Sequence, residues 1–460
     1  MEHTANKVNK NAILIVAVLT SFLAPFMGSS TNIVLPAIGA EFSMDAISLS
    51  WVVSSYLLAT AVFLLPIGRF ADIYGLKKIL LLGTISFTLF SLVLAITTSP
   101  VILIVMRAFQ GLSSAMIFGT GVAILTSAFP ARERGRALGI NVASVYLGLS
   151  LGPFLGGILT ENFGWRSVFW AIVPLGLIVI FVILSKLKGE WTAAKGEKFD
   201  LIGSVIYGVS LVSFMYGLSV LPEINAVWFL GIGFVSLLAF IWWEMKTPSP
   251  LLDLNIILHN RVFAFSNIAV LINFSATFAV AFLLSLYLQY TQGMSPQAAG
   301  LVLISQPVVM AIVSPFAGKL SDKTQPQNVA ALGMAITAVG LLYFGFIDAD
   351  TSVAAITLGL VIVGLGLSLF SSPNTNAIMS SVESKNYGVA SAILSTMRVV
   401  GNIFSMGVVT VLFAIFIGRV EITPEYYSPF LSSIRISFII FAVLCFLGVF
   451  ASWVRGKPQE

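Results

Sequence analysis

Fourteen apolar segments, each long enough to cross a lipid bilayer, constrain the fold of this chain more than any other feature. A membrane-spanning helix needs about 20 mostly apolar residues, and the sequence is 58% hydrophobic and only 9% charged. Soluble domains are typically about 45–50% apolar and about 25% charged. The sequence therefore predicts an all-α integral membrane protein with 14 transmembrane helices. The predicted spans are residues 12–38, 48–70, 79–97, 101–127, 137–160, 166–187, 201–221, 226–244, 262–290, 297–317, 328–347, 352–373, 387–417 and 432–454.

The positions of Lys and Arg predict the orientation of these spans. If the N-terminus lies in the cytoplasm, 19 of the 24 Lys and Arg residues fall in cytoplasmic segments, three fall outside and two lie within spans. Positively charged residues concentrate in the cytoplasmic loops of membrane proteins. We therefore expect a multi-pass protein of the plasma membrane with both termini in the cytoplasm. Because the basic residues are spread over short loops, the net charge of +5 does not indicate a nucleic-acid partner.

Two loops repeat the same spacing of Gly and Asp. Gly68 and Asp72 follow the second predicted span, and Gly318 and Asp322 follow the tenth, 250 residues later in each case. Two related halves around a site at the membrane midplane are typical of transporters. We predict two pseudo-symmetric six-helix bundles with two inserted central helices between them. The predicted domains are residues 1–187 for the N-terminal bundle, 188–261 for the inserted helices with their cytoplasmic linkers, and 262–460 for the C-terminal bundle.

Four motifs resemble those of a known family. They are the loop 68–78 with its partial copy at 318–323, the sequence R-A-F-Q-G that begins at Arg107, the run G-L-S-L-G-P-F-L-G-G from Gly148 to Gly157, and N-I-V-L-P, which begins at Asn32. Together they resemble the major facilitator superfamily, and specifically its fourteen-span drug:proton antiporter branch of multidrug and quaternary ammonium exporters. The resemblance extends over essentially the whole chain. It implies secondary active transport by alternating access, driven by a transmembrane proton gradient and without a cofactor.

The loop 68–78 and its copy predict a conformational latch. Glycine at position 68 removes a side chain where helices approach, and Gly75 permits a tight turn. Asp72 can accept hydrogen bonds from a helix N-terminus or pair with a cationic side chain. A turn with positively charged membrane anchors is the alternative, but the resemblance implies a latch that stabilises the outward-open state. The predicted latch residues are Gly68, Asp72, Gly75, Lys77, Lys78, Gly318 and Asp322.

Two arginines lie within predicted spans. Arg107 lies several residues into the fourth span, and Arg398 lies deeper in the thirteenth. A cation at such a depth is costly unless it pairs or faces water. We therefore expect both arginines to line a central cavity or to organise proton movement, with Gln110 on the same helix face as Arg107. For Arg107 the alternative is a side chain that extends to the membrane interface.

The run from Gly148 to Gly157 predicts a bent helix. Its G-x-x-x-G spacing lets two helices touch closely, and Pro153 removes a backbone hydrogen bond and kinks the helix. The resemblance implies that this run also marks an export antiporter, whereas the alternative is a bent packing helix with no bearing on direction. The predicted hinge residues are Gly148, Gly152, Pro153, Gly156 and Gly157.

The carboxylate that usually carries the proton is absent from the first span. The resemblance implies an Asp five positions before Asn32, but Met27 stands there. All 19 Asp and Glu residues fall at or beyond the ends of the predicted spans. Proton coupling is therefore expected to use an interfacial carboxylate, either Glu161 or Asp72, the latter favoured by an expected proximity to Arg107. Two arginines without a balancing acid favour neutral or anionic amphiphiles over dications.

Polar and aromatic side chains within the spans are the candidate substrate contacts. Buried amides more often bridge helices than bind substrate, and most of the 36 Phe residues are expected to pack or to face lipid. Each candidate is therefore a hypothesis. The predicted substrate-binding residues are Phe26, Ser30, Asn32, Gln110, Asn273, Gln306 and Asn374.

The favoured function is export of amphiphilic drugs or toxic small molecules by a monomeric secondary transporter in the lipid bilayer. A uniporter, or a dedicated exporter of one metabolite or lipid, is the alternative within this class. A polytopic membrane enzyme is more remote, because the chain has no H-E-x-x-H, no G-x-S-x-G and no phosphate-binding loop. With one cysteine, Cys445, and two histidines, His3 and His259, no metal site is expected.

Overall fold

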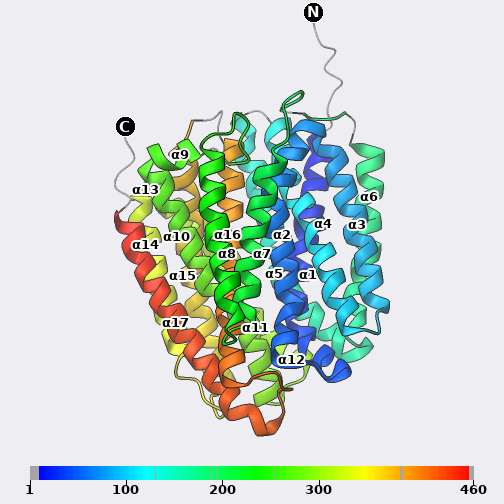
Figure 1. Cartoon of the computed structure of the whole chain (residues 1–460), viewed down its shortest axis with the longest axis vertical. Coiled ribbons are helices and arrows are strands. Elements are labelled where there is room, and N and C mark those ends of the chain that lie inside the picture. Colours follow the sequence, from blue (N-terminus) through cyan, green and yellow to red (C-terminus); the bar gives the residue numbers. More distant parts are fainter. Residues whose placement is uncertain are drawn as a thin grey trace, which may run out of the picture.

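The computed structural model confirms the all-α transmembrane fold. It describes residues 10–129, 131–187, 189–192, 194–252, 254–383 and 387–454. Within this part, 14 helical segments are long and apolar enough to cross a membrane, and each overlaps one predicted span. Figure 1 shows the helices running side by side, with the start of α1 and the end of α17 at the same end of the molecule. We call this the terminal end and the opposite one the far end.

The first six spans are continuous helices whose starts are set by local sequence. At the start of α2, Asp45 Oδ1 accepts the backbone N–H groups of Ile47 and Ser48 at 2.9 Å each, as a helix-capping residue does. Pro100 opens α4, where its missing N–H costs nothing. The helices of this first half are α1 (Lys10–Phe42), α2 (Ala46–Tyr74), α3 (Leu76–Ile96), α4 (Pro100–Ala128), α5 (Ala131–Phe163) and α6 (Arg166–Lys186).

The inserted hairpin touches both halves of the molecule. Figure 1 shows it between the blue and cyan helices of the first half and the yellow to red helices of the second. The Tyr207 hydroxyl donates to the Ala61 carbonyl of α2 at 3.2 Å. The Phe214 ring meets the Phe404 ring of α16 edge-on, with 5.3 Å between ring centres. The inserted helices are α7 (Leu201–Ser219) and α8 (Asn225–Glu244).

Two spans of the second half are divided into shorter helices. The ninth is interrupted after Thr277, where the Ala279 N–H donates to Ser405 Oγ at 3.0 Å, and an inserted side chain is a common cause of a bend. The tenth is interrupted at Ile304, just before Pro307, which lacks an N–H to continue the helix. The elements are α9 (Leu254–His259), α10 (Arg261–Thr277), α11 (Ala279–Leu286), η1 (Tyr287–Thr291), α12 (Pro296–Leu303), α13 (Ser305–Lys323), α14 (Pro326–Phe344), α15 (Val353–Ser380), α16 (Tyr387–Phe416), η3 (Pro424–Tyr426) and α17 (Tyr427–Val454).

The two halves meet at the far end. There α1 packs against α11, α5 against α12, and α2 against α16. Ser285 Oγ of α11 donates to the Asn32 carbonyl of α1 at 2.6 Å. The Ala46 N–H at the start of α2 donates to the Val420 carbonyl at 3.2 Å. In this structure the halves are therefore closed against each other at the far end.

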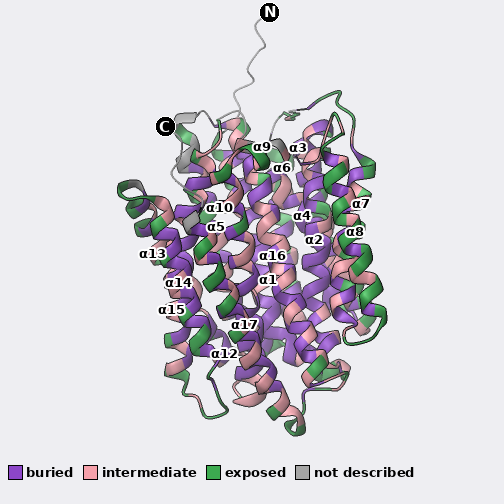
Figure 2. Ribbon diagram, turned by 60° about the vertical axis from the view of Figure 1, so that its left-hand side comes forward, coloured by how far each residue is buried: buried purple, intermediate pink, exposed green. Residues whose placement is uncertain are grey.

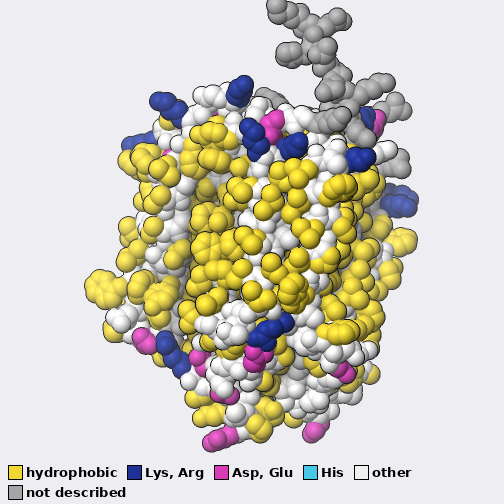
Figure 3. All heavy atoms as spheres, turned by 90° about the vertical axis from the view of Figure 1, so that its right-hand side faces the viewer, with side chains coloured by type: hydrophobic (Ala, Val, Ile, Leu, Met, Phe, Trp, Pro, Cys, Tyr) yellow, Lys and Arg dark blue, Asp and Glu magenta, His cyan; other side chains and the backbone are white. Residues whose placement is uncertain are grey.

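The outer surface carries an apolar belt. On the face shown in Figure 3, hydrophobic side chains cover the middle of the molecule, most Lys and Arg side chains gather toward the terminal end, and Asp and Glu gather mostly toward the far end. Figure 2 shows buried residues concentrated along the inner helices, and α8 is much less buried than α1 or α2. This is the distribution expected when the outer helices face lipid.

Candidate functional site

The glycine run of α5 brings that helix into direct contact with α1. A Cβ atom at Gly148 would lie 2.8 Å from a backbone oxygen of α1, and one at Gly152 would lie 1.8 Å from Ser29 Oγ. Gly156 lies on the same face, because residues four apart are neighbours on a helix. Ser30 Oγ donates to the Gly152 carbonyl at 3.0 Å. The close helix contact predicted from the G-x-x-x-G spacing is therefore present.

The same run also contacts the other half of the molecule. A Cβ atom at Gly157 would lie 2.5 Å from the Pro296 carbonyl oxygen, and one at Gly300 of α12 would lie 2.2 Å from the Pro153 carbonyl oxygen. Side chains essentially never make contacts this short, so both positions need glycine. The α5 helix therefore packs on α1 while it closes the far end against α12. Hinge bending at these residues stays a prediction.

Glu161 lies at this contact between the halves. Its Oε2 accepts the backbone N–H of Gln297 at the start of α12, at 3.1 Å. Nearby, Gln289 Nε2 of η1 donates to the Ile33 carbonyl of α1 at 3.1 Å. A carboxylate at a helix N-terminus is favoured by the helix dipole, so Glu161 helps to hold the far end closed. That it carries the coupling proton stays a prediction.

Arg107 is buried inside the first half. Arg107 is only 1% exposed. Its Nε donates to the Val52 carbonyl at 3.0 Å, and its Nη1 donates to Gln110 Oε1. The guanidinium lies 4.4 Å from the centre of the Tyr56 ring. Gln110 Nε2 in turn donates to Ser91 Oγ at 2.8 Å. Partners on α2 and α3 therefore hold Arg107 and Gln110 within the bundle in this structure, whereas a role in lining a cavity or organising proton movement stays a prediction.

Arg398 lies at the boundary between the halves. It is about 11 residues into α16, which is about 16 Å along the helix from the terminal end. Its Nη2 donates to Thr375 Oγ1 at 3.1 Å, its guanidinium lies 5.6 Å from the centre of the Phe274 ring, and Tyr146 of α5 interacts with it electrostatically. Its Nε is buried and has no hydrogen-bond partner among the described residues. A buried unpaired donor costs about 1–3 kcal/mol, so this group favours an acceptor supplied by a ligand.

A neighbour of this arginine was not predicted from the sequence. Asn402 follows Arg398 by one helical turn, on the same face, and its Oδ1 is also buried without a partner in the described part of the chain. The spacing of four residues is a sequence signal that could have found it. No such signal marks Tyr146 and Thr375, because they come from other helices and only packing brings them to Arg398.

Three predicted substrate contacts lie close together on α1. Phe26 and Ser30 are buried where α1 meets α5, and Ser30 Oγ is already bonded to the Gly152 carbonyl. Asn32 is 5% exposed, and its Oδ1 is unpaired within the described residues. Asn32 therefore has a free side-chain acceptor beside the contact between the halves, whereas the Ser30 hydroxyl serves packing.

The predicted amides of the second half mainly connect helices. Asn273 Nδ2 lies 3.9 Å from Cys445 Sγ of α17, and Asn374 Nδ2 donates to the Ser266 carbonyl of α10 at 3.0 Å. Gln306 is partly buried at the start of α13, where the tenth span bends. Amides that bridge helices are common in membrane proteins. The predicted substrate-binding residues are therefore spread over several helix contacts and do not form one site in this structure.

The first latch loop is held by the linker that follows α6. Gly75 separates α2 from α3 with φ of +124°, a conformation that favours glycine. Glu190 Oε1 of the linker accepts the Lys77 N–H at 2.7 Å, and the Leu76 N–H donates to the Trp191 carbonyl at 3.0 Å. The loop is thus a tight turn whose following helix is capped by a carboxylate from the linker.

Asp72 lies far from Arg107. It is partly buried at the terminal end of α2, close to Arg69, whose guanidinium pairs with Glu197 of the linker. Arg107 binds the Val52 carbonyl, which lies about 20 residues earlier in α2 and hence about 30 Å away along the helix. The expected proximity of Asp72 to Arg107 was therefore wrong, because Asp72 lies near the end of α2 whereas Arg107, on α4, contacts α2 near its start.

The remaining latch residues differ in how tightly they pack. A Cβ atom at Gly68 would meet no atom within 4 Å, and one at Gly318 would lie 3.1 Å from Ser372 Oγ of α15. Lys78 is exposed at the start of α3. The side chain of Asp322 lies outside the described residues. That the two loops act as a conformational latch stays a prediction.

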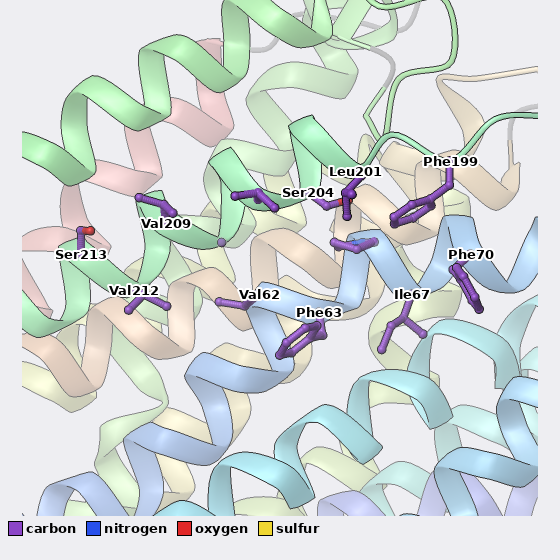
Figure 4. A pocket seen from close by; sticks show the side chains of 13 residues that line it. Val62, Phe63, Ile67, Phe70, Phe199, Leu201, Ser204, Val209, Val212 and Ser213 are labelled. Carbon is purple, nitrogen blue, oxygen red and sulfur yellow. The ribbon is translucent and has the colours of Figure 1, made fainter.

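An apolar pocket of about 540 Å³ lies between α2 and α7. Figure 4 shows Val62 and Phe63 of α2 on one side of it and Val212 of α7 on the other. Its lining is apolar except for Ser204 and Ser213, so it suits a hydrocarbon chain better than a polar head group. Among the described residues, no group of three or more His, Cys, Asp or Glu side chains could hold a metal ion.

Comparison with known proteins decides the family. The family model described as Major Facilitator Superfamily matches residues 17–406 and 267–460. The chain belongs to this superfamily. A crystal structure titled a bacterial homolog to human lysosomal transporter Spinster, in an inward-facing and unoccupied conformation, has the same fold, with a TM-score of 0.71 at 14% identity over 98% of each chain. The predicted family and fold are confirmed.

Relatives of this superfamily member are transport and resistance proteins. Riboflavin transporter RibZ of Clostridioides difficile is 30% identical over 95% of each chain. Multidrug resistance protein Stp of Mycobacterium tuberculosis is 31% identical over 82% of this chain and 71% of Stp. Cephamycin export protein CmcT of Amycolatopsis lactamdurans is 32% identical over 88% of this chain and 85% of CmcT. This superfamily member is therefore a membrane transporter.

We predict that Gly300→Leu prevents the halves from closing at the far end. Even a Cβ atom at this position would come within 2.2 Å of the Pro153 carbonyl oxygen. Ser285→Cys, at a position that is fully buried at this contact, should react with a membrane-impermeant maleimide several-fold faster when combined with Gly300→Leu. Gly231→Leu on α8 is the control, because a Cβ atom there meets no atom within 4 Å. Equal labelling rates in both backgrounds would contradict the prediction.

We predict that Gly75→Ala destabilises the protein by about 1–3 kcal/mol, because alanine at this positive φ is strained and its Cβ would lie 2.5 Å from Glu190 Cδ. Thermal unfolding of the purified protein in detergent measures the effect. Gly68→Ala, in open space on α2, should leave Tm unchanged or raise it. Equal Tm values for the two variants would show that the turn at Gly75 is not constrained.

Proposed function

We propose that this transporter exports neutral or anionic amphiphilic small molecules by alternating access, driven by the transmembrane proton gradient. The observation that carries the proposal is the environment of Arg398, which lies deep in the membrane-spanning region with an unpaired Nε, one helical turn before Asn402, whose Oδ1 is also unpaired. The ion pairs of the described residues do not include Arg398. An uncompensated positive charge favours substrates that bring an acceptor or a negative charge, and it disfavours dications.

Aromatic side chains supply the apolar part of this proposed binding region. Phe274 lies beside the guanidinium on the second half, and Tyr146 on α5 of the first half interacts with it electrostatically. An amphiphilic substrate would place its polar group on Arg398 and Asn402 and its ring system against these aromatics. Because the contributing helices belong to both halves, movement of the halves would change the affinity, as alternating access requires.

We infer that the terminal end faces the cytoplasm and that the protein lies in the plasma membrane. Lys and Arg side chains gather at the terminal end on the face shown in Figure 3, which agrees with the positive-inside rule. In this orientation the contact between the halves lies on the outer side of the membrane. Release to the outside would then require α5 to separate from α12 and α1 to separate from α11. We expect a monomer to suffice, because both halves belong to one chain.

A dedicated carrier for one metabolite is the second candidate function. RibZ, named a riboflavin transporter, matches this chain over 95% of both lengths. Riboflavin is a planar aromatic molecule with many acceptors and no positive charge. It therefore has the chemistry that an arginine, an amide and aromatic side chains would recognise.

Flux measurements in proteoliposomes test the proposed function and separate it from the alternative. The panel would contain a neutral amphiphilic dye, an anionic dye, a dicationic quaternary ammonium compound and riboflavin, each with an imposed pH gradient of either sign. Export driven by protons predicts transport of the neutral and anionic compounds against their gradients only when the pH gradient has the right sign. Transport of riboflavin alone would establish the dedicated carrier. Preferred transport of the dication would overturn the proposal.

We predict that Arg398→Gln weakens binding of the anionic dye by about tenfold or more, because a hydrogen bond to a charged group contributes about 1.5–3 kcal/mol. The neutral dye should lose less, and Arg398→Lys should restore part of the affinity for the anion. Arg419→Gln is the control, since Arg419 is exposed at the far end and 3.5 Å from Glu223. Equal effects on neutral and anionic dyes would show that Arg398 has only a structural role.

A further inference from the structure

Two carboxylates meet at the terminal end of the inserted hairpin. Asp200 directly precedes α7 and Glu244 ends α8, and they are 9% and 4% exposed. A Cβ atom at Gly203 would lie 2.3 Å from Asp200 Oδ2 and 2.7 Å from Glu244 Oε1, so these two oxygens are at most about 5 Å apart. The sequence placed both carboxylates at the edge of the membrane, whereas the structure buries them against each other.

The hydrogen bonds of this carboxylate pair leave one oxygen unpaired. Asp200 Oδ1 accepts the Gly203 N–H at 2.9 Å, and Trp243 Nε1 donates to both Asp200 oxygens, at 3.1 and 3.0 Å. Glu244 Oε2 accepts the Leu252 N–H at 2.9 Å. Glu244 Oε1, on the side of Asp200 Oδ2, is buried without a partner in the described part of the chain. A proton bound between the two carboxyl groups would give Glu244 Oε1 a hydrogen-bonding partner.

Two of the cations around the pair are engaged elsewhere. Lys246 Nζ lies 4.1 Å from the centre of the Trp242 ring, and Arg69 of α2 pairs with Glu197. Like charges within about 4–6 Å disfavour each other's ionisation. The ion pairs of the described residues do not include Asp200 or Glu244, so this buried carboxylate pair favours binding of one proton. The other charged groups on the elements that contact the hairpin, namely α2, α16 and the linker residues next to α7 and α8, are Arg69, Asp72, Glu197, Lys198, Lys246 and Arg398.

The pair lies where both linkers of the insert end. Residues 194–200 lead into α7 from the side of the first half, and residues 245–252 leave α8 toward the second. Asp200 caps the start of α7, and Glu244 holds the outgoing linker through the Leu252 N–H. The α7 helix itself packs against α2 of the first half and α16 of the second. A change in the distance between the two carboxyl groups would therefore act on segments that contact both halves.

We propose that Asp200 and Glu244 form a proton-binding site that joins the two linkers of the inserted hairpin. With one proton bound, the carboxyl O–H of one residue donates to the carboxylate of the other. When the proton passes to water at the terminal end, two negative charges are left close together. Their repulsion then moves the two carboxylates apart. The insert then loosens from its linkers, which permits the halves to move. The role in the transport cycle rests on the proposed proton-driven export, but the binding of the proton does not.

Thermal unfolding of the purified full-length protein between about pH 5.5 and 8.5 tests the site directly. A carboxylate pair that binds a proton more tightly in the folded state contributes stability at low pH, and this stability is lost as the pH rises. Glu244→Gln carries no proton that can be removed, so it should abolish about 2–4 °C of the fall in Tm over this range. Asp200→Asn should have the same effect and serves as a second variant if Glu244→Gln does not fold.

Glu223→Gln is the matched control for this experiment. Glu223 is an exposed carboxylate between the same two helices, at the far end of the hairpin. Its replacement should leave the slope of Tm against pH as in the unmodified protein. If Glu244→Gln and Asp200→Asn keep that slope as well, the proton-binding site is overturned, whatever the protein transports.

Flux in proteoliposomes distinguishes failure of this inference from failure of the proposed function. A pH gradient should stimulate transport by the unmodified protein and by Glu223→Gln, and the stimulation should disappear in Glu244→Gln. If the unmodified protein shows no stimulation but Glu244→Gln still removes the slope of Tm, the site stands and proton-driven export fails. If the stimulation survives in Glu244→Gln, the proposed role of the pair in transport is overturned.

Discussion

The close contact of α5 with a helix on either side is the interaction on which the rest of the structure depends. Lipid tails are as apolar as the helix surfaces, so helices in a membrane associate through tight packing and hydrogen bonds. Gly148 and Gly152 let α5 touch α1 within the first half, and Gly157 and Gly300 let it touch α12 across the boundary. Opening of the far end must break the second contact, while the first can keep the half intact.

The two intramembrane arginines show how the surroundings of a charge separate structure from function. Arg107 has acceptors on Val52 and Gln110 and an aromatic ring beneath it, so its charge is satisfied inside one half. Arg398 has one hydroxyl partner, an unpaired Nε and neighbours from both halves. A fully satisfied cation stabilises one arrangement of helices, whereas an unsatisfied one at a moving boundary favours a ligand.

The inserted hairpin is more than a spacer between the halves. The α7 helix packs on α2 and α16, and the linkers at its terminal end contact the turn at Gly75 and meet at Asp200 and Glu244. The same linker that caps α3 through Glu190 therefore continues into the buried carboxylate pair. Under the proposed proton binding, changes at the pair would act on the loop of the first half and on the start of the second without a direct contact between those segments.

The sequence by itself determined the 14 spans, because a bilayer leaves the backbone no hydrogen-bonding partner but the helix, and hydropathy reports this residue by residue. It also determined the close packing of α5, since the G-x-x-x-G spacing lies within one helix. It determined the family as well, since each motif is a short run of neighbouring residues. Only the tertiary structure decided that Arg398 and not Arg107 lies between the halves, and that Glu244 is buried. Those outcomes depend on partners from segments that are distant in the sequence. The residues of a single span do not indicate which of its faces will contact those partners.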